Sequence, residues 1–335
     1  MPQNGDQREV FDITIIGAGP TGLFGCFYAG LRGMKTKVIE ALPEPGGQLA
    51  ILYPEKFIYD VPGFPRILAK DLVRELTEQA FQFHPTVCWN ERVQDLWRDE
   101  EGLLHLRTDV DEHLSKTVLI AAGIGAFHPN KLDRPGVAEF EGKGVYYFVQ
   151  QKAALRDKRV LIVGGGDSAV DWALTLKDWA KEVTLIHRRT GFRALESSVV
   201  ELMNSPVHVK LHYELKEVGG NEHVEYATIF NNKTGEEETL PVDVVLLFLG
   251  YKADMSLIES WGLEGDGRHI FVNGRMETNI PGVYAAGDIA LDPNSVNLNL
   301  IVTGFAQATV AVNCAKSLID PQSRVFPGHS SEKRL

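Results

Sequence analysis

The sequence predicts an α/β protein that contains two βαβ units, each organised around a glycine-rich turn. Two observations support this prediction. A G-x-G-x-x-G motif follows an apolar strand at residues 17–22, and a G-x-G-x-x-A motif follows another apolar strand at residues 164–169. In each unit a second apolar stretch ends 18 residues after the motif, at residues 40 and 187. A length of 335 residues is sufficient for two domains.

The first unit has the strand, turn, helix and strand order of a dinucleotide-binding motif. Its strands are expected at residues 10–16 and 37–40, with a helix at 23–33. The first glycine permits a sharp turn, the second lets a pyrophosphate approach the backbone, and the third lets the helix pack on the strand. The helix N-terminus offers N–H groups to the phosphates. The predicted phosphate-binding residues are Gly17, Gly19, Pro20, Thr21 and Gly22.

The second unit repeats this order in the middle of the chain. Its strands are expected at residues 159–163 and 183–187, with a helix near 170–180. Two such motifs, each between a strand and a helix, are far more specific than a single G-x-G-x-x-G run. We therefore predict a second dinucleotide site, with phosphate-binding residues Gly164, Gly166, Asp167, Ser168 and Ala169.

The ends of the two second strands differ in charge, and this difference predicts which dinucleotide each unit binds. Glu40 can accept hydrogen bonds from a ribose 2′-hydroxyl and would repel a 2′-phosphate. The second unit ends instead in His187, Arg188 and Arg189, followed by Arg193. One guanidinium group can bind two oxygens of a phosphate at once. The cluster therefore predicts a site for the 2′-phosphate of NADPH. A solvated basic turn is the alternative.

A third glycine segment, T-x-x-P-G-V-Y-A-A-G-D at residues 278–288, resembles the second FAD fingerprint of the flavin disulfide reductases. In that family the aspartate, here Asp288, holds a ribityl hydroxyl. The stretches 118–123 and 244–250 resemble the two crossovers that bound the family's inserted NADPH domain. The resemblance spans residues 11 to about 318. It implies the fold of low-molecular-weight thioredoxin reductase, with two Rossmann-like, three-layer ββα domains.

The resemblance also implies the order of the domains along the chain. A discontinuous FAD-binding domain is expected at residues 1–123 and 248–320. The NADPH-binding domain is expected at residues 124–247, between the two crossovers. Residues 321–335 are expected to form a C-terminal extension over the flavin.

One departure from thioredoxin reductase bears on the expected activity. That family carries a C-x-x-C pair in its NADPH domain, and Phe148 and Gln151 stand at those positions here. Disulfide reduction by that mechanism needs a thiolate pair near the flavin, so it is excluded. The stretches 46–64, 125–129 and 324–331 are instead similar to the thioredoxin-reductase-like ferredoxin–NADP reductases.

That subfamily implies further residues of the FAD site. Tyr53 stacks on one face of the isoalloxazine, and Gln48, in the loop that contains Gly47, hydrogen-bonds near it. Val93 meets the adenine through its backbone, and Phe127 lines the site. The residues alone leave open that the three apolar or aromatic side chains are ordinary core residues.

The C-terminal extension is expected to complete the site. By the same resemblance His329, with Ser330 and Ser331, covers the other face of the flavin from the partner protomer, and a serine helps to position the nicotinamide. The resemblance thereby implies a homodimer. A frayed chain end is the alternative, because chain termini are often poorly ordered.

The composition excludes several other classes of protein. With 34 basic and 45 acidic residues the net charge is −11, which argues against broad nucleic-acid binding. No apolar run reaches the length of a membrane span, and residues 1–9 contain no signal-peptide core. The three cysteines are scattered without metal-ligand spacing, so we expect no metal and a soluble protein in the reducing cytoplasm.

Together, the motifs and the resemblance predict an enzyme, a ferredoxin–NADP⁺ reductase. NADPH would pass hydride to FAD, and the reduced flavin would pass single electrons to ferredoxin or flavodoxin. One alternative is an NADPH-dependent flavoprotein reductase of a small disulfide or a quinone. Another is a flavin-binding redox sensor with low turnover.

Overall fold

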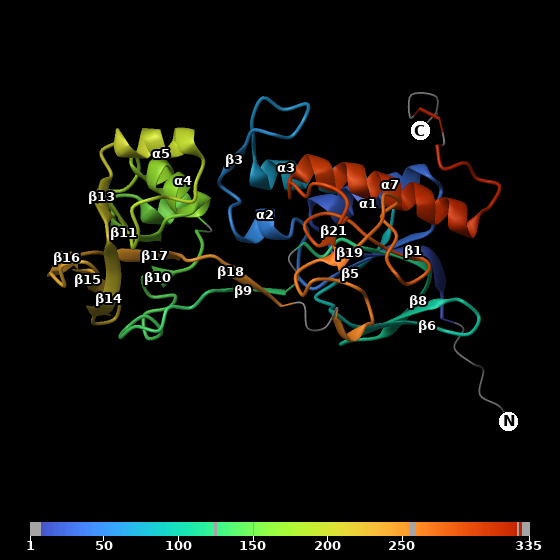
Figure 1. Cartoon of the computed structure of the whole chain (residues 1–335), viewed down its shortest axis with the longest axis horizontal. Coiled ribbons are helices and arrows are strands. Elements are labelled where there is room, and N and C mark those ends of the chain that lie inside the picture. Colours follow the sequence, from blue (N-terminus) through green and yellow to red (C-terminus); the bar gives the residue numbers. More distant parts are fainter. Residues whose placement is uncertain (1–7, 124–125, 150, 255–258, 327, 330–335) are drawn as a thin grey trace. The chain divides into compact units, whose positions relative to one another are not determined.

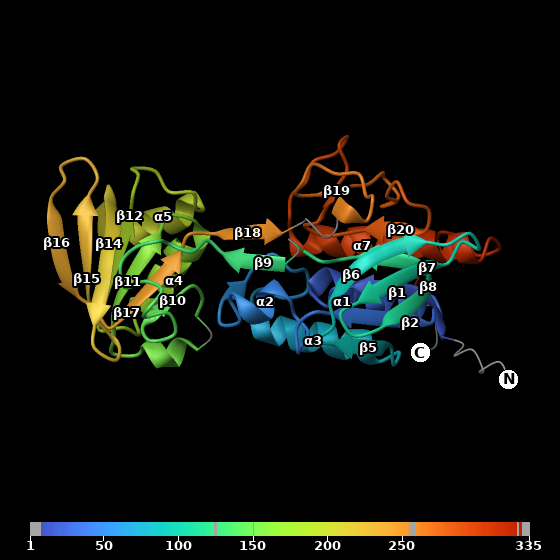
Figure 2. The ribbon, with the colours of Figure 1, turned by 90° about the horizontal axis from the view of Figure 1, so that it is seen from below.

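The computed structural model describes residues 8–123, 126–149, 151–254, 259–326 and 328–329. The chain divides into two compact units (Figures 1 and 2). The first unit contains the residues up to 127 and those from 253 onward, and the second unit contains residues 128–252. From the sequence, the corresponding domain boundaries were expected between residues 123 and 124 and between residues 247 and 248. The assignment of FAD to the first unit and NADPH to the second stays a prediction.

The first unit is built on a sheet whose strands follow the order β5–β2–β1–β8–β7–β6, with β20 also paired to β8. β1, β2, β5, β8 and β20 run parallel, whereas β7 is antiparallel to both β6 and β8. The strands are β1 (Val10–Ile16), β2 (Thr36–Glu40), β5 (Thr86–Trp89), β6 (Val93–Arg98), β7 (Leu104–Thr108), β8 (Glu112–Ile120) and β20 (Val283–Ala285).

Helices and short strand pairs complete this unit. The helices are α1 (Pro20–Leu31), α2 (Gln48–Ile51), α3 (Ala69–Phe81) and α7 (Ile301–Ile319). The short pairs are β3 (Phe57–Ile58) with β4 (Ile67–Leu68), and β19 (Ile270–Phe271) with β21 (Ala290–Leu291). No helix of the described residues is long and apolar enough to cross a membrane.

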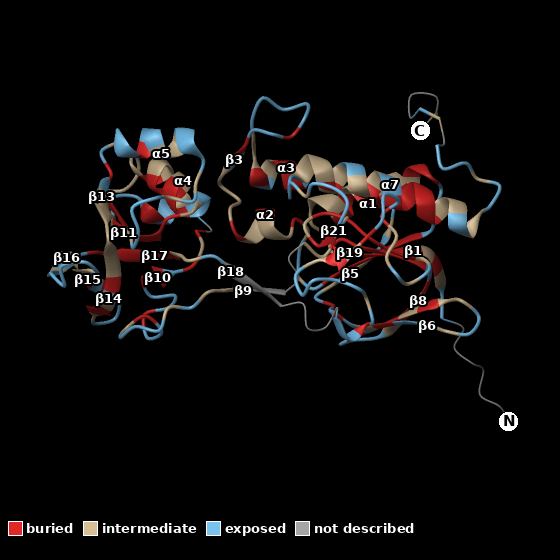
Figure 3. Ribbon diagram, in the orientation of Figure 1, coloured by how far each residue is buried: buried red, intermediate tan, exposed pale blue. Residues whose placement is uncertain are grey.

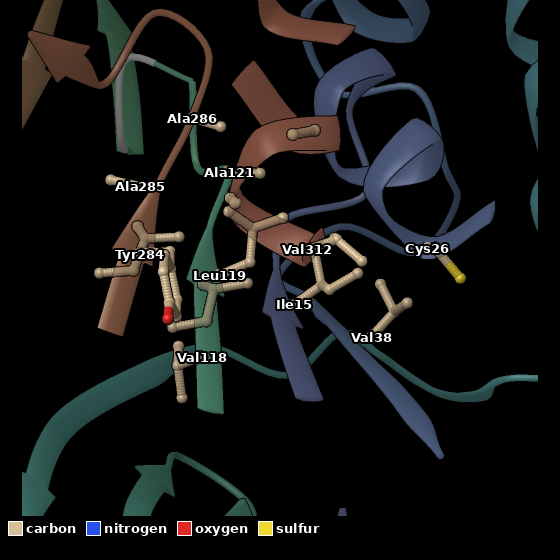
Figure 4. Close-up of a cluster of buried hydrophobic side chains, with 14 of the residues drawn as sticks. Ile15, Cys26, Val38, Val118, Leu119, Ala121, Tyr284, Ala285, Ala286 and Val312 are labelled. Atoms are coloured by element: carbon tan, nitrogen blue, oxygen red, sulfur yellow. The ribbon is translucent and has the colours of Figure 1, made fainter. Parts of the chain in front are cut away.

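The core of the first unit lies where α1 and α7 pack on the parallel strands. Ile15, Leu119 and Val312 are fully buried there, and Figure 4 shows their side chains close together. A Cβ on Gly25 of α1 would lie 2.8 Å from Leu119 and 3.6 Å from Ala308 of α7. Both helices therefore pack closely on the same face of the sheet. The buried strands form the red centre of this unit in Figure 3.

The second unit has three layers. Its parallel sheet has the order β10–β17–β11–β12–β13, and a separate antiparallel sheet has the order β14–β15–β16. The strands are β10 (Val145–Tyr146), β11 (Arg159–Gly164), β12 (Glu182–His187), β13 (His208–Leu211), β14 (Tyr213–Gly220), β15 (Val224–Asn231), β16 (Glu237–Pro241) and β17 (Val244–Phe248). The helices are α4 (Asp167–Leu176), α5 (Glu196–Met203) and the 3₁₀ helix η1 (Lys152–Leu155).

The side chains of β11 alternate between the two faces of the parallel sheet, and this alternation explains how the sheet packs against both other layers. Leu161 and Val163 belong to the apolar cluster shared with the antiparallel sheet, whereas Val160 and Ile162 belong to the cluster shared with α4 and α5. Successive side chains of a strand point to opposite faces, so this sheet is covered on both. The layered α/β fold predicted from the sequence is confirmed.

Both helices that follow the glycine turns begin three residues earlier than predicted. α1 starts at Pro20 rather than residue 23, and α4 starts at Asp167 rather than residue 170. Proline suits the first helical position because it needs no N–H partner there, and an acidic residue favours the positive end of the helix dipole. As a result, Gly19 and Gly166 are the N-cap residues of these helices.

Two strands connect the units. β9 (Ala126–Pro129) leads into the second unit and β18 (Tyr251–Asp254) leads out of it. The two strands pair with each other in a sheet of their own. The second unit is therefore inserted into the first through a pair of adjacent strands.

An ion pair joins β11 to β17 in the second unit. Oδ1 of Asp243 accepts a hydrogen bond from Nη2 of Arg159 at 2.6 Å, and Oδ2 accepts one from the backbone N–H of Arg159 at 2.7 Å. The guanidinium lowers the pKa of Asp243 to about 2. The pair therefore stabilises the folded unit only while the carboxylate is ionised.

We expect Asp243→Asn to lower the free energy of unfolding by about 1 kcal/mol at pH 7, because solvent screens this partly exposed pair. The pKa of Asp243 in the folded protein, about 2, lies below the ordinary value of 3.8. The stabilisation by the ion pair is therefore fully present above pH 3.8 and is lost as the pH falls toward 2. Urea unfolding of both proteins at pH 7 and pH 3 should give a smaller difference at pH 3. An equal difference at the two pH values would contradict this account.

Candidate functional site

The first glycine turn leaves no room for a side chain at its first and last positions. Gly17 has a φ of +103°, and a Cβ there would lie 2.6 Å from the carbonyl oxygen of Ala121. A Cβ on Gly22 would lie 1.9 Å from the carbonyl oxygen of Gly17. At Gly19, by contrast, a Cβ would meet no atom within 4 Å. Open space therefore lies over Gly19, at the N-terminus of α1, which no side chain caps.

A second glycine loop packs on this turn. Gly47 has a φ of +53°, and a Cβ there would lie 3.2 Å from Cα of Gly19. α2 then begins at Gln48, whose Nε2 donates a hydrogen bond to Oδ2 of Asp288 at 3.3 Å. The structure thus brings together Gly19, Gly47, Gln48 and Asp288, which the sequence assigned to one site.

The segment at residues 278–288 reaches this place because β20 pairs with the end of β8. The chain then turns at Gly287, where φ is +82° and a Cβ would lie 2.8 Å from Oγ1 of Thr21. A Cβ on Gly304 of α7 would lie 2.3 Å from the same oxygen, so Thr21 packs between two glycines. Burial raises the pKa of Asp288, the residue after this turn, above its ordinary value.

Glu40 ends β2 with 7% of its surface exposed. Its Oε2 accepts a hydrogen bond from the backbone N–H of Ala18 at 2.6 Å, and its Oε1 accepts one from the backbone N–H of Leu42 at 2.9 Å. Burial raises the pKa of Glu40, although these backbone hydrogen bonds oppose the change. The carboxylate ties the glycine turn to the end of β2, a role that the sequence did not reveal. Its contact with a ribose stays a prediction.

Tyr53 is half-buried against the core of the first unit. Burial, with smaller effects of Asp288 and Asp60, raises the pKa of its hydroxyl to about 12, so the phenol is neutral at physiological pH. Val93 is buried at the start of β6. The side chain of Phe127 lies outside the described part of the chain. The predicted contacts of these three residues with a flavin stay predictions.

The C-terminal segment begins beyond the end of α7 (Figure 1). His329 is exposed, and its ring lies edge-on to Phe326 with the ring centroids 5.4 Å apart. Ser330 and Ser331 lie outside the described residues. Because Gly304 and Thr21 meet near the other end of α7, the segment starts about one helix length from the first glycine turn.

The second glycine turn has the same construction as the first. A Cβ on Gly164 would lie 2.5 Å from the carbonyl oxygen of Phe248, at the end of β17. It would also lie 3.0 Å from Cβ of Ala169, which is fully buried. Gly166 caps α4 without a side-chain hydrogen bond. Asp167 and Ser168 are exposed in the first turn of α4.

The segment after β12 folds back onto this turn. The backbone N–H of Arg193 donates to the carbonyl oxygen of Gly165 at 2.7 Å. The ring of His187 stacks on Phe192, and its Nε2 donates to the carbonyl oxygen of Gly191 at 3.0 Å. A Cβ on Gly165 would lie 2.2 Å from the His187 ring, so glycine allows the imidazole to close over the turn. Burial and the nearby arginines lower the pKa of His187.

Three arginines surround this turn. Arg188, Arg189 and Arg193 are exposed, and no carboxylate of the described residues forms an ion pair with them. They stand out in a chain whose net charge is −11. Unpaired guanidinium groups beside an uncapped helix N-terminus are suited to bind phosphate oxygens.

Sequence reasoning missed a buried polar cluster that joins the first residues of β2 and β8. Nζ of Lys37 lies 2.7 Å from Nδ1 of His113, whose Nε2 lies 2.5 Å from Oε1 of Glu91. Because an ammonium group can only donate, Nδ1 accepts and Nε2–H donates. Glu91 also accepts from Thr108 at 2.7 Å. No spacing signal links these residues, since they come from different strands and loops.

The three cysteines do not form a reactive pair. Each is a free thiol, on α1 (Cys26), on β5 (Cys88) and on α7 (Cys314). Burial raises the pKa of Cys26 to about 12 and that of Cys88 to about 11. Cys88 lies with Glu91 and His113 in a group whose potential metal-ligand atoms are within 4.8 Å of one another. Both ring nitrogens of that histidine are already hydrogen-bonded, so we interpret the group as a hydrogen-bond network.

The fold is that of an α/β protein with two glycine turns, each at the N-terminus of a helix without a side-chain cap. Residues 11–315 match the family model described as pyridine nucleotide-disulphide oxidoreductase, and the chain belongs to this family.

Individual relatives agree with this membership. The chain is 57% identical to a ferredoxin–NADP reductase of Symbiobacterium thermophilum, with 98% of each chain covered. It is 50% identical to one of Thermus thermophilus, with 96% of this chain and 97% of the relative covered. Among solved structures, the thioredoxin reductase of Lactococcus lactis is 27% identical with a TM-score of 0.79, over 92% of this chain and 99% of that one.

The first turn offers a matched pair of substitutions. In Gly22→Ala the new methyl group would overlap the carbonyl of Gly17, so we expect loss of thermal stability and of bound flavin. In Gly19→Ala the methyl group meets no protein atom and φ is an ordinary −71°, so stability should be retained. It would instead occupy the space expected for the pyrophosphate, and the flavin content of the purified protein should fall. Full flavin content in Gly19→Ala would contradict the assignment.

Proposed function

We propose that this protein is a ferredoxin–NADP⁺ reductase, an enzyme that uses FAD and takes its reducing equivalents from NADPH. The main observation is the presence of two glycine turns with uncapped helix N-termini in a chain without a redox-active cysteine pair. Relatives of that name, 48–57% identical over nearly the whole chain, support the proposal.

The residues around the first turn fit FAD. The uncapped N-terminus of α1 and the open space over Gly19 suit a pyrophosphate that must lie close to the backbone. Asp288 is a hydrogen-bond acceptor placed for a polyol hydroxyl, next to the amide of Gln48. Glu40 has hydrogen bonds from the protein at both oxygens, and each oxygen keeps a lone pair for a ribose hydroxyl.

The other proposed FAD contacts follow from the family resemblance. Tyr53 would stack on the isoalloxazine as a neutral phenol, and His329 with the two serines after it would cover the second face. Val93 would meet the adenine through its backbone, and Phe127 would line the FAD site. The residues proposed to hold FAD are Gly17, Gly19, Pro20, Thr21, Gly22, Glu40, Gly47, Gln48, Tyr53, Val93, Phe127, Asp288, Ser330 and Ser331. A tail that covers the flavin of a partner protomer makes the proposed assembly a homodimer.

The second turn fits NADPH. The N-terminus of α4 carries no side-chain cap and would donate its N–H groups to the pyrophosphate, and the exposed Arg188, Arg189 and Arg193 would bind the 2′-phosphate. His187 keeps the arginine segment on the turn through its contact with Phe192. Bound at the first turn, FAD would supply the redox chemistry that links the two-electron donor NADPH to a one-electron acceptor. The protein's residues orient the two cofactors and hold their phosphates.

The cysteines favour a one-electron carrier over a disulfide as the acceptor. The three thiols lie on separate elements and burial raises the pKa of each, so they do not provide the thiolate pair that disulfide exchange by cysteines requires. We propose ferredoxin as the acceptor and flavodoxin as a second one. Three free thiols also agree with a location in the reducing cytoplasm.

The decisive test is NADPH-driven reduction of the organism's own ferredoxin, followed by its visible absorbance. We expect reduction of ferredoxin and no reaction with a small disulfide supplied at equal concentration. A protein that consumes NADPH with the disulfide but not with ferredoxin would reject the proposal.

Arg188→Ala combined with Arg189→Ala tests the second turn. The KM for NADPH should rise by about 10–100-fold, because two charge-assisted contacts to the 2′-phosphate are lost. The KM for NADH, which lacks that phosphate, should stay nearly the same. The matched control is Arg134→Ala, a change of another arginine in the same unit, which should affect neither KM. Equal losses for both nucleotides would reject the 2′-phosphate assignment.

A further inference from the structure

Arg32 is a buried arginine that holds the C-terminal segment on the first unit. It follows α1, is 8% exposed, and its Nη1 donates to Oδ1 of Asn313 on α7. Its other acceptors belong to the segment after α7. Nη1 donates to the carbonyl oxygen of Val325 at 3.1 Å, and Nη2 donates to the carbonyl oxygen of Arg324 at 2.9 Å and to Oγ of Ser323 at 2.8 Å. One side chain thus holds three consecutive residues.

All four of these acceptors are neutral groups. Among the described residues, no carboxylate lies within ion-pair distance of Arg32. Asp320 acts on the guanidinium only from beyond ion-pair distance. A buried cation is costly unless its N–H groups are hydrogen-bonded, so the guanidinium needs these acceptors in place. The N–H groups of a guanidinium also point in fixed directions. The side chain therefore determines the path of the backbone at residues 323–325.

Beyond Ser323, little else in the described structure fixes that path. The side chains of Arg324, Val325 and Phe326 are exposed, with 65% exposure for Phe326, so they contribute little packing. The backbone N–H of Ser323 donates to the carbonyl oxygen of Asp320, and its carbonyl oxygen accepts from Oγ of Ser317 at 3.3 Å, so these two bonds hold only Ser323 to the end of α7. Phe326 is the residue directly after the last acceptor of Arg32, and its ring contacts His329. This ring contact is the described link between the residues that Arg32 holds and His329.

The same contacts keep the segment away from the first glycine turn of its own chain. α7 has 19 residues and so spans about 28 Å. Thr21 and Gly304 meet near its start, whereas the segment follows its end (Figure 1). This placement agrees with a tail that serves a second copy of the chain.

We propose that Arg32 is a positioning residue, which directs the C-terminal segment and thereby places His329 for the reaction. The inference rests on the proposed function, in which His329 covers the flavin. Lysine at this position would retain the charge but could not reach the acceptors along the fixed directions of a guanidinium.

A double-mutant cycle of Arg32→Lys and His329→Ala in the full-length protein tests this inference. We measure kcat for NADPH-driven ferredoxin reduction. Each single variant should lower kcat roughly tenfold, because misplacement of a group at the reacting centre has effects of this size or larger. The double variant should be no slower than His329→Ala alone, since Arg32 acts through His329. Trypsin cleavage after Arg324 should also be faster in Arg32→Lys.

A second variant, Ser323→Ala, keeps the inference testable if Arg32→Lys does not fold. Ser323→Ala removes one acceptor and should give a smaller loss of kcat that also disappears in the His329→Ala background. It decides the question if Arg32→Lys does not fold. The matched control is Arg275→Lys, because Arg275 is an exposed arginine of the same unit that pairs with Glu277, and its kcat should be unchanged.

Three outcomes would overturn the inference while the proposed function stands. The first is an equal loss of kcat from Arg32→Lys in the wild-type and the His329→Ala backgrounds. The second is a normal kcat in His329→Ala alone. The third is trypsin cleavage of Arg32→Lys at the wild-type rate. Each would be observed in a protein that still reduces ferredoxin. If the wild-type protein fails to reduce ferredoxin, the proposed function is rejected, and the inference with it.

Discussion

Both units depend on one steric constraint, the passage of the chain past a carbonyl oxygen of the neighbouring parallel strand. A Cβ on Gly17 would lie 2.6 Å from the carbonyl oxygen of Ala121, and a Cβ on Gly164 would lie 2.5 Å from that of Phe248. No side chain fits at these distances. Each turn can therefore leave its strand directly into a helix whose N-terminus remains at the edge of the sheet.

The position of each turn in its sheet explains why that edge can hold a ligand. β1 lies between β2 and β8, and β11 lies between β12 and β17. The chain continues from each turn to one neighbour and returns much later to the other, so the connections diverge at this place. Such a switch point leaves a crevice at the carboxyl ends of the strands. The first crevice receives further residues from the loop at Gly47 and from the turn at Gly287.

The sequence was sufficient to predict the strands and glycine turns of the two βαβ units, because their signals are local runs of apolar residues and glycines. It placed the starts of α1 and α4 three residues late, since apolar periodicity begins only after the first helical turn. It did not reveal the hydrogen bond that Glu40 accepts from the glycine turn, the network of Lys37, His113 and Glu91, or the contacts of Arg32. Those contacts join residues far apart in the chain, and only tertiary packing brings them together.

The insertion of the second unit between paired strands also sets the order in which the protein is made. On the ribosome, residues 128–252 are complete before β20 and α7 have been synthesised. At roughly 5–20 residues per second, β1 and its glycine turn wait some tens of seconds for these partners. The inserted unit has every strand of its own sheets by then and can fold first. The first unit, although its synthesis begins earlier, is the last to close its core.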